Sequence, residues 1–180
     1  MGIGLSTYTL DWTAAPNLFR QLFYTRTELN ALRLNPPARQ RVQDGQPARV
    51  TVPTNAIGAR AYHVIDGRLE PGGVDLMPLA RDGAIPWNAP AGEWEVCVFA
   101  AEPQPNTLNP LLAGIGEIVV RDFYQRFQDA TPNRSPEGLN YFFNDELNVG
   151  AGLQAWTRDF AAEFKQRKGY DVFEVLPALW

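Results

Sequence analysis

The chain has 180 residues, 45% of them hydrophobic, which suits one globular domain or one domain and a fraction with a sizeable core. Lys and Arg number 16 against 20 Asp and Glu, a net charge of −4, and no basic cluster exceeds residues 165–168, so nucleic acid is not an expected partner. One cysteine excludes an internal disulfide, one histidine excludes a multi-histidine zinc site, and no apolar run is long enough to suggest a membrane partner.

A strand is predicted at the very beginning of the chain, over residues 2–12, where Ile3 and Leu5 alternate with small or polar residues. No basic segment or long apolar segment precedes it, so the N-terminus does not resemble a signal peptide, and the cellular location is not indicated. The strand ends at Asp11 and Trp12. Asp11 is interpreted either as a residue that caps a turn or as a contributor to a cleft at the strand's end.

Residues 20–92 have the pattern of a β-rich segment with many turns. Aromatic and β-branched residues over 23–29 favour a strand, and residues 49–52 form another short one. Residues 63–69 predict a hairpin, because Asp66-Gly67 is a preferred two-residue turn. Short strands with frequent turns indicate a small antiparallel sandwich. His63, in a strand of this segment, is expected to be structural rather than catalytic.

The segment after residue 92 changes from strand to helix. Residues 94–99 predict an apolar strand in which Cys97 is a buried core residue. Asn109 is a candidate N-cap with Pro110 at the first helical position, and an apolar stripe follows, made of Leu112, Ile115, Val119, Phe123 and Phe127. A second helix is predicted from Thr157, its candidate N-cap, to a stop at Gly169.

Between these helices lies the most informative stretch, residues 139–150. It begins as a strand that is apolar on both faces, as in sheets covered on both sides, and then changes to Asn144-Asp145-Glu146. Carboxylates at the C-terminal end of such a strand occupy the position where (β/α) barrels and doubly wound sheets carry their chemistry. They are also common wherever a strand reaches solvent. The pattern alone leaves both interpretations open.

Several stretches together resemble a known family. The sequences GLNYFFNDELNVG and DFAAEFKQRKGYDVFEVLPALW are similar to the motif region of calcium-dependent α-L-rhamnosidases of glycoside hydrolase family 106, which are large inverting enzymes with a (β/α)8 catalytic barrel. VDLMPLARDGAIPWNAPAGEWEVCVFA, TLNPLLAGIGEIVVRDFYQRF and GIGLSTYTLDW resemble further parts of that barrel and its β-rich insertion. The resemblance implies an α/β chain in which residues 1–19 and 93–180 form an incomplete (β/α)8 TIM-type barrel, about half of it, and residues 20–92 the insertion.

The resemblance also implies the site residues. Glu146 falls at the position of an active-site carboxylate. If the strand persists to residue 146, only one of Asp145 and Glu146 faces the barrel lumen, because successive side chains of a strand point to opposite faces, and we expect that one to be Glu146. Asp145, Asn144, Asp11 and Trp12 are expected to contact the substrate. Inverting glycosidases need two carboxylates roughly 6.5–9.5 Å apart. The second is expected beyond Trp180; Glu102 is the nearest substitute, but adjoining prolines predict a loop there.

The expected activity is inverting hydrolysis of a terminal deoxysugar from a glycan or glycoside, with a carbohydrate as substrate. Calcium is implied by the resemblance alone, since no compact loop rich in Asp and Asn supplies its oxygen ligands. A complete barrel needs about 200–250 residues, so the chain is expected to be a segment of a larger enzyme that pairs with the remainder or with itself. The alternative is a carbohydrate-binding module, or a fragment, without activity of its own.

Overall fold

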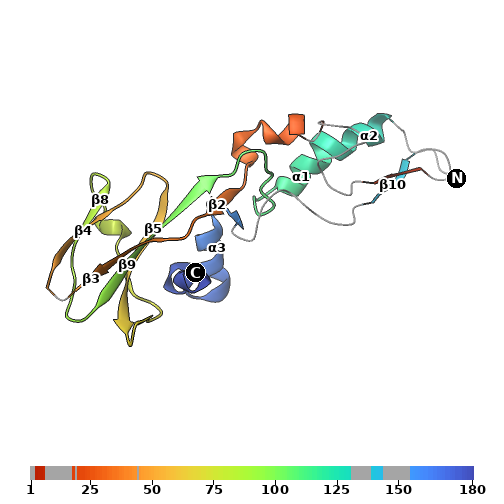
Figure 1. The fold of residues 1–180 in the computed structure, drawn as a ribbon. Coiled ribbons are helices and arrows are strands. Elements are labelled where there is room, and N and C mark those ends of the chain that lie inside the picture. Colours follow the sequence, from red (N-terminus) through yellow and green to blue (C-terminus); the bar gives the residue numbers. More distant parts are fainter. Residues whose placement is uncertain (1–2, 7–17, 19, 44, 131–138, 144–154) are drawn as a thin grey trace. The chain divides into compact units, whose positions relative to one another are not determined.

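The computed structural model describes residues 3–6, 18, 20–43, 45–130, 139–143 and 155–180. The chain forms two compact units, each built from two stretches of sequence: unit 1 comprises residues 1–33 and 103–157, and unit 2 residues 34–102 and 158–180. Helix and sheet are mixed, and most of the strand pairs are antiparallel (Figure 1). The expected mixture of helix and strand is therefore present, whereas the half barrel and its insertion at residues 20–92 stay predictions.

Unit 2 is built around two long strands, β5 (Ala56–Ile65) and β9 (Trp94–Pro103), which pair antiparallel. Strand β3 (Ala38–Val42) pairs with the other edge of β9, while β6 (Arg68–Leu69) and β7 (Val74–Asp75) pair with β5. Strands β4 (Pro47–Thr51) and β8 (Ala84–Asn88) form a separate two-stranded sheet, and η3 (Met77–Leu79) is a helical turn. These observations confirm the strands predicted at residues 49–52 and 94–99.

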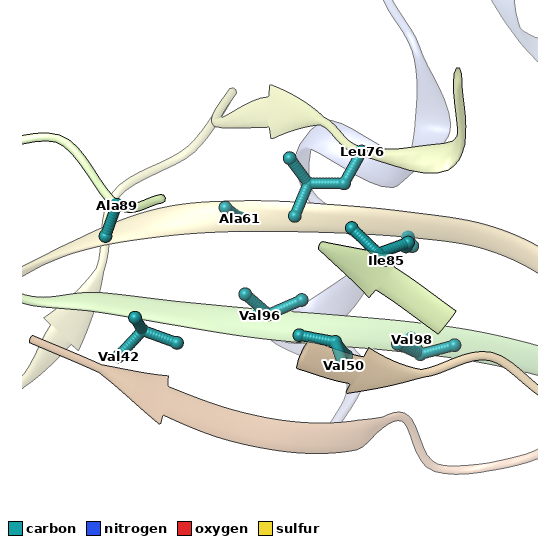
Figure 2. Packing of buried hydrophobic residues seen from close by; sticks show 9 residues of the cluster. Val42, Val50, Ala61, Leu76, Ile85, Ala89, Val96 and Val98 are labelled. Carbon is teal, nitrogen blue, oxygen red and sulfur yellow. The ribbon is translucent and has the colours of Figure 1, made fainter. Parts of the chain in front are cut away.

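The core of unit 2 lies between its larger sheet and the β4–β8 pair. Alternate residues of β9, Val96 and Val98, point into this space, where they meet Val50 of β4 and Ile85 of β8 (Figure 2). Leu76, just before η3, is fully buried in the same cluster. The larger sheet and the β4–β8 pair thus each bury one apolar face against the other, as expected for the small antiparallel sandwich predicted from the sequence.

The opposite face of β9 is covered as well. Cys97 and Phe99, which alternate with the core valines, are both fully buried, and Phe99 packs on Phe173 with ring centroids 5.3 Å apart. Gly58 of β5 lies directly beneath Phe173, since a Cβ atom at position 58 would be 2.7 Å from its ring. Burial on both faces explains why residues 94–99 read as a nearly continuous apolar run.

The predicted Asp66-Gly67 hairpin is confirmed. Ile65 pairs with Arg68 across the turn, and both turn residues have a positive φ, 49° for Asp66 and 76° for Gly67. A two-residue turn with positive φ at both positions matches the twist of the strands that it joins. His63, on β5, stacks against Trp94 with ring centroids 5.0 Å apart, a packing contact in keeping with its expected structural role.

Unit 1 contains a continuous helical stretch, in which α1 (Ile115–Val119), the π-helical turn η4 (Val120–Tyr124) and α2 (Gln125–Ala130) follow one another without a break. The predicted apolar stripe is confirmed, because all five of its residues belong to one hydrophobic cluster with Phe23, Leu29 and Leu108. The predicted start is wrong. Asn109 accepts a hydrogen bond from the Leu111 backbone N–H, but only a turn follows, and the helix begins at Ile115 after Gly114.

The strand predicted over residues 23–29 is also wrong. The chain forms two short helical turns there, η1 (Arg20–Tyr24) and η2 (Thr27–Leu29). Phe23 is fully buried, and Leu29 nearly so, in the cluster with Val119 and Phe123. Tertiary packing therefore overrides the β-propensity of the aromatic and threonine residues. Strand β2 (Leu32–Leu34) follows and pairs antiparallel with β11 (Ala155–Trp156).

The last 21 residues of the chain contain one helix and two short helical turns, and they belong to unit 2. Helix α3 (Phe160–Lys168) begins after Asp159 rather than at Thr157, and it ends as predicted at Gly169, whose φ of 82° is favourable only for glycine. The turns η5 (Val172–Glu174) and η6 (Leu176–Leu179) complete this segment. No helix among the described residues is long and apolar enough to cross a membrane.

Ile85→Ala should lower the free energy of unfolding by about 2–5 kcal/mol, because truncation of a buried Ile loses burial and leaves a cavity. Ile65→Ala makes the same chemical change at a side chain that is 46% exposed and should cost about 0.5 kcal/mol or less. Urea unfolding followed by circular dichroism measures both. Equal losses in the two variants would contradict the assignment of the core.

The pKa of the Cys97 thiol is raised to about 11 by burial, so the folded chain keeps it protonated at pH 8. We expect a thiol reagent to label the native chain far more slowly than the urea-unfolded chain at this pH, because the thiolate is the reactive form. Absorbance at the reagent's product wavelength gives both rates. Equally fast labelling of native and unfolded chains would show that Cys97 is accessible.

Candidate active site

Two neighbouring strands of unit 1 lead toward the predicted site residues. Strand β10 (Leu139–Phe143) pairs in parallel with β1 (Ile3–Ser6), although the two lie more than 130 residues apart in the sequence. Their last residues are partners, Ser6 with Phe143, so both strands end at the same edge. The strand predicted at the start of residues 139–150 is therefore confirmed, and its end coincides with the change from apolar to acidic residues.

The parallel pairing is the most informative observation for function. Parallel strands place the residues that follow them at one edge of the sheet, which is where α/β enzymes carry their sites. Asn144 is the next residue after β10, and Asp11 follows the end of β1 by five positions. The five predicted site residues themselves lie outside the described residues: Asp11, Trp12, Asn144, Asp145 and Glu146. Their roles stay predictions.

A second acid considered from the sequence, Glu102, is placed differently from the expectation. It lies near the end of strand β9, not in a loop, and its side chain is exposed. Pro103 is the last residue of the strand and Pro105 follows it, so neither proline interrupts the strand at Glu102. Glu102 is therefore a solvated carboxylate, unlike the partly buried carboxyl group of a typical general acid.

In the helical stretch of unit 1, the acidic side chain Asp122 forms ion pairs with two arginines. Asp122 on η4 accepts hydrogen bonds from Arg121 and from Arg26, whose Nη1 is 3.0 Å from the carboxylate. The Arg121 hydrogen bond, with a smaller contribution from Arg26, lowers the pKa of Asp122 below its ordinary value. A carboxylate held ionised in this way is suited to bind a cation rather than to donate a proton.

In unit 2, the motif residues Gly169 and Asp171 of the KGYD stretch have structural roles. Gly169 ends helix α3, and Asp171 caps η5 by accepting a hydrogen bond from the Phe173 N–H at 3.0 Å. The other carboxylate oxygen of Asp171 lies 3.3 Å from Nη2 of Arg60, whose side chain is only 10% exposed. Nη1 of Arg60 donates to the Gly72 and Gly73 carbonyls. This ion pair joins the C-terminal segment, residues 169–180, to strand β5.

Two further side chains of the sheet hold the same segment. The Tyr62 hydroxyl donates to the carbonyl of Phe173, and Nη2 of Arg39 donates to the Pro177 carbonyl at 3.3 Å. Burial raises the pKa of Tyr62 well above its ordinary value, so the hydroxyl remains a donor at neutral pH. Nη1 of Arg39 meanwhile pairs with buried Glu95 at 2.9 Å. The C-terminal segment is thus fixed at three points along the sheet.

A pocket of about 370 Å³ opens where this segment meets the β5–β6 hairpin. This pocket has no signature in the sequence, because its lining comes from three separate stretches that only the fold brings together. The lining residues are Arg39, Tyr62, Gly67, Arg68, Leu69, Glu70, Pro71, Glu174, Val175, Pro177, Ala178 and Trp180.

Within the described part of the chain, no three His, Cys, Asp or Glu side chains lie close enough together to hold a metal ion. Calcium therefore stays a prediction from the family resemblance, and no cluster of acidic side chains among the described residues supplies its ligands.

Glycoside hydrolases and other α/β enzymes both place acidic residues after parallel strands. Comparison with known families distinguishes between these classes of enzyme. The family model for alpha-L-rhamnosidase, glycoside hydrolase family 106, matches residues 74–180. This match covers more than half of the chain and includes β10 and the acids after it, so the chain belongs to the alpha-L-rhamnosidase family. No curated protein and no solved structure matches the chain significantly.

Arg60→Met should lower the free energy of unfolding by about 3 kcal/mol, because it leaves the Asp171 carboxylate without its ion-pair partner. This value is at the lower end for a buried ion pair, since Asp171 keeps some contact with solvent. Arg68→Met removes an exposed guanidinium that makes no ion pair among the described residues, so it should cost about 0.5 kcal/mol or less. Urea unfolding compares them. A loss as small in Arg60→Met as in Arg68→Met would show that the ion pair does not hold the C-terminal segment.

Proposed function

We propose that this chain takes part in the inverting hydrolysis of α-L-rhamnosides, with Glu146 as one of the two catalytic carboxylates. The observation that carries the proposal is the family match, which spans strand β10 and the acidic residues that follow its last residue, Phe143. The parallel pairing of β10 with β1 supports it, because enzymes with parallel strands carry their catalytic groups at the strands' carboxyl ends.

The chemistry assigns Glu146 one of two roles. In inverting hydrolysis a protonated carboxylic acid donates its proton to the oxygen of the departing group, while an ionised carboxylate removes a proton from a water molecule. That water attacks the anomeric carbon from the opposite face, so the configuration inverts. Glu146 supplies the acid or the base, and the complementary group is a second carboxylate.

The neighbouring residues have supporting roles in this proposal. Asn144 and Asp145 offer an amide and a carboxylate that hydrogen-bond the sugar hydroxyls. Asp11 provides a further acceptor, and the indole of Trp12 offers an apolar surface for the sugar ring. Asp145 has a supporting role here because the family resemblance aligns the active-site carboxylate with Glu146 and not with its neighbour.

The proposal predicts that Glu146→Gln lowers turnover of an aryl α-L-rhamnoside by about 10²–10⁴-fold, the contribution of a positioned acid or base. Asp145→Asn is the matched control, an acid-to-amide change at the adjacent position, and should retain more than a tenth of the activity. Release of the aryl group is measured by its absorbance. The assay is run once with added calcium and once with a chelator, and further segments of the enzyme are added if turnover requires them. Circular dichroism confirms that both variants are folded.

Proton nuclear magnetic resonance of the first product distinguishes the stereochemistry, because inversion releases the β-anomer of rhamnose before mutarotation. Full activity in Glu146→Gln, or a loss confined to Asp145→Asn, would overturn the assignment of Glu146. Saturable sugar binding by a chain without any turnover under all these conditions would favour the alternative of a non-catalytic carbohydrate-binding module.

A further inference from the structure

The pocket between the β5–β6 hairpin and the C-terminal segment has the size and composition of a ligand site. Its volume of about 370 Å³ lies at the lower end of the range for small-molecule sites, roughly 300–1,000 Å³. All its lining residues belong to unit 2, and none of them is a predicted catalytic or substrate-contacting residue. The proposed function leaves this pocket unexplained.

The apolar part of the pocket is held in place by the framework of the sheet. Leu69, Val175 and Pro177 contribute aliphatic surface, and the indole of Trp180 adds an aromatic face that is 37% exposed. The Trp180 backbone is fixed, because its carbonyl accepts a hydrogen bond from Nη2 of Arg39 at 3.4 Å and its N–H donates to Pro177. An exposed indole on an anchored backbone provides a ready stacking surface.

The polar part of the pocket has unused hydrogen-bonding capacity. Among the described residues, the side chains of Arg68 and Glu70 make no hydrogen bond or ion pair. Oε1 of Glu174 accepts the Asp171 N–H at 3.3 Å, while its Oε2 has no hydrogen-bond partner within the described part of the chain and is available to a ligand. The lining holds two cationic side chains, Arg39 and Arg68, and two anionic ones, Glu70 and Glu174. Arg39 is already paired with Glu95, so the lining has no excess of positive charge for an anionic ligand.

A neutral polyol with an apolar face satisfies both halves of this lining. A sugar ring presents C–H groups to an aromatic surface, while its hydroxyls both donate and accept hydrogen bonds. Carboxylates accept from hydroxyls, and a guanidinium donates to them. We propose that this pocket binds one neutral sugar unit of the saccharide without cleaving it. The choice of rhamnose as that sugar rests on the proposed function.

Isothermal titration of the full chain carrying Glu146→Gln with methyl α-L-rhamnoside tests the proposal, and the ligand is analysed after the titration to verify that it has not been hydrolysed. Trp180→Ala, added to the host, should weaken binding about tenfold through loss of the stacking surface. Glu70→Gln should weaken it at least about fivefold through loss of a charge-assisted hydrogen bond. Leu111→Ala is the control: it truncates a side chain of unit 1 that is 46% exposed, and affinity should not change.

Absence of saturable binding up to about 10 mM ligand, or unchanged affinity in both pocket variants, would overturn the proposal. Glu70 is an exposed side chain, so Glu70→Gln tests the pocket even if Trp180→Ala disturbs folding. The result is separable from the catalytic assignment. Binding measured in the pocket does not depend on whether Glu146 is catalytic, and loss of turnover in Glu146→Gln stands whether or not the pocket binds sugar.

Discussion

The ion pair between Arg60 and Asp171 is the interaction on which much of unit 2 depends. Arg60 is nine-tenths buried, and its Nε has no hydrogen-bond partner among the described residues, so the guanidinium relies on Asp171 and two carbonyls to offset the loss of water. The pair fixes the start of the C-terminal segment, and this in turn seats Phe173 over Gly58 and Phe99. Without that segment, one face of the sheet would be open and the pocket beside Trp180 would lose a wall.

Strand β9 shows how one sequence pattern serves two environments. Val96 and Val98 fill the core beneath the β4–β8 pair, while Cys97 and Phe99 pack beneath the C-terminal segment. Glu95, on the face of Cys97, is buried yet bonded to both Arg39 and Arg41. These arginines stand on β3, the neighbouring strand, where Arg41 is the register partner of Glu95. Cross-strand pairing therefore compensates the one charge that the apolar run contains.

Structures that depend on a few adjacent residues were predictable from the sequence. The Asp66-Gly67 turn and the glycine that ends α3 are examples, because neighbouring residues alone determine each of them. The strand predicted over residues 23–29 was wrong because Phe23 is buried by helices nearly 100 residues away, which propensity cannot register. The pairing of Arg60 with Asp171 and the pocket have no sequence signature, for they join separate stretches. For the candidate active site, strand β10 and its end were predictable, whereas the roles of Glu146 and its neighbours are predictions from the family resemblance.

The discontinuity of unit 2 has a consequence for the nascent chain. Arg60 and Asp171 are 111 residues apart, so at a synthesis rate of roughly 5–20 residues per second Arg60 is made about 6–20 s before its partner. During that interval the sheet of β3, β5 and β9 can pair, but the surface around Gly58 and Phe99 is exposed and Arg60 has no carboxylate. That surface is covered only when the residues after Gly169 have been made and close over the sheet.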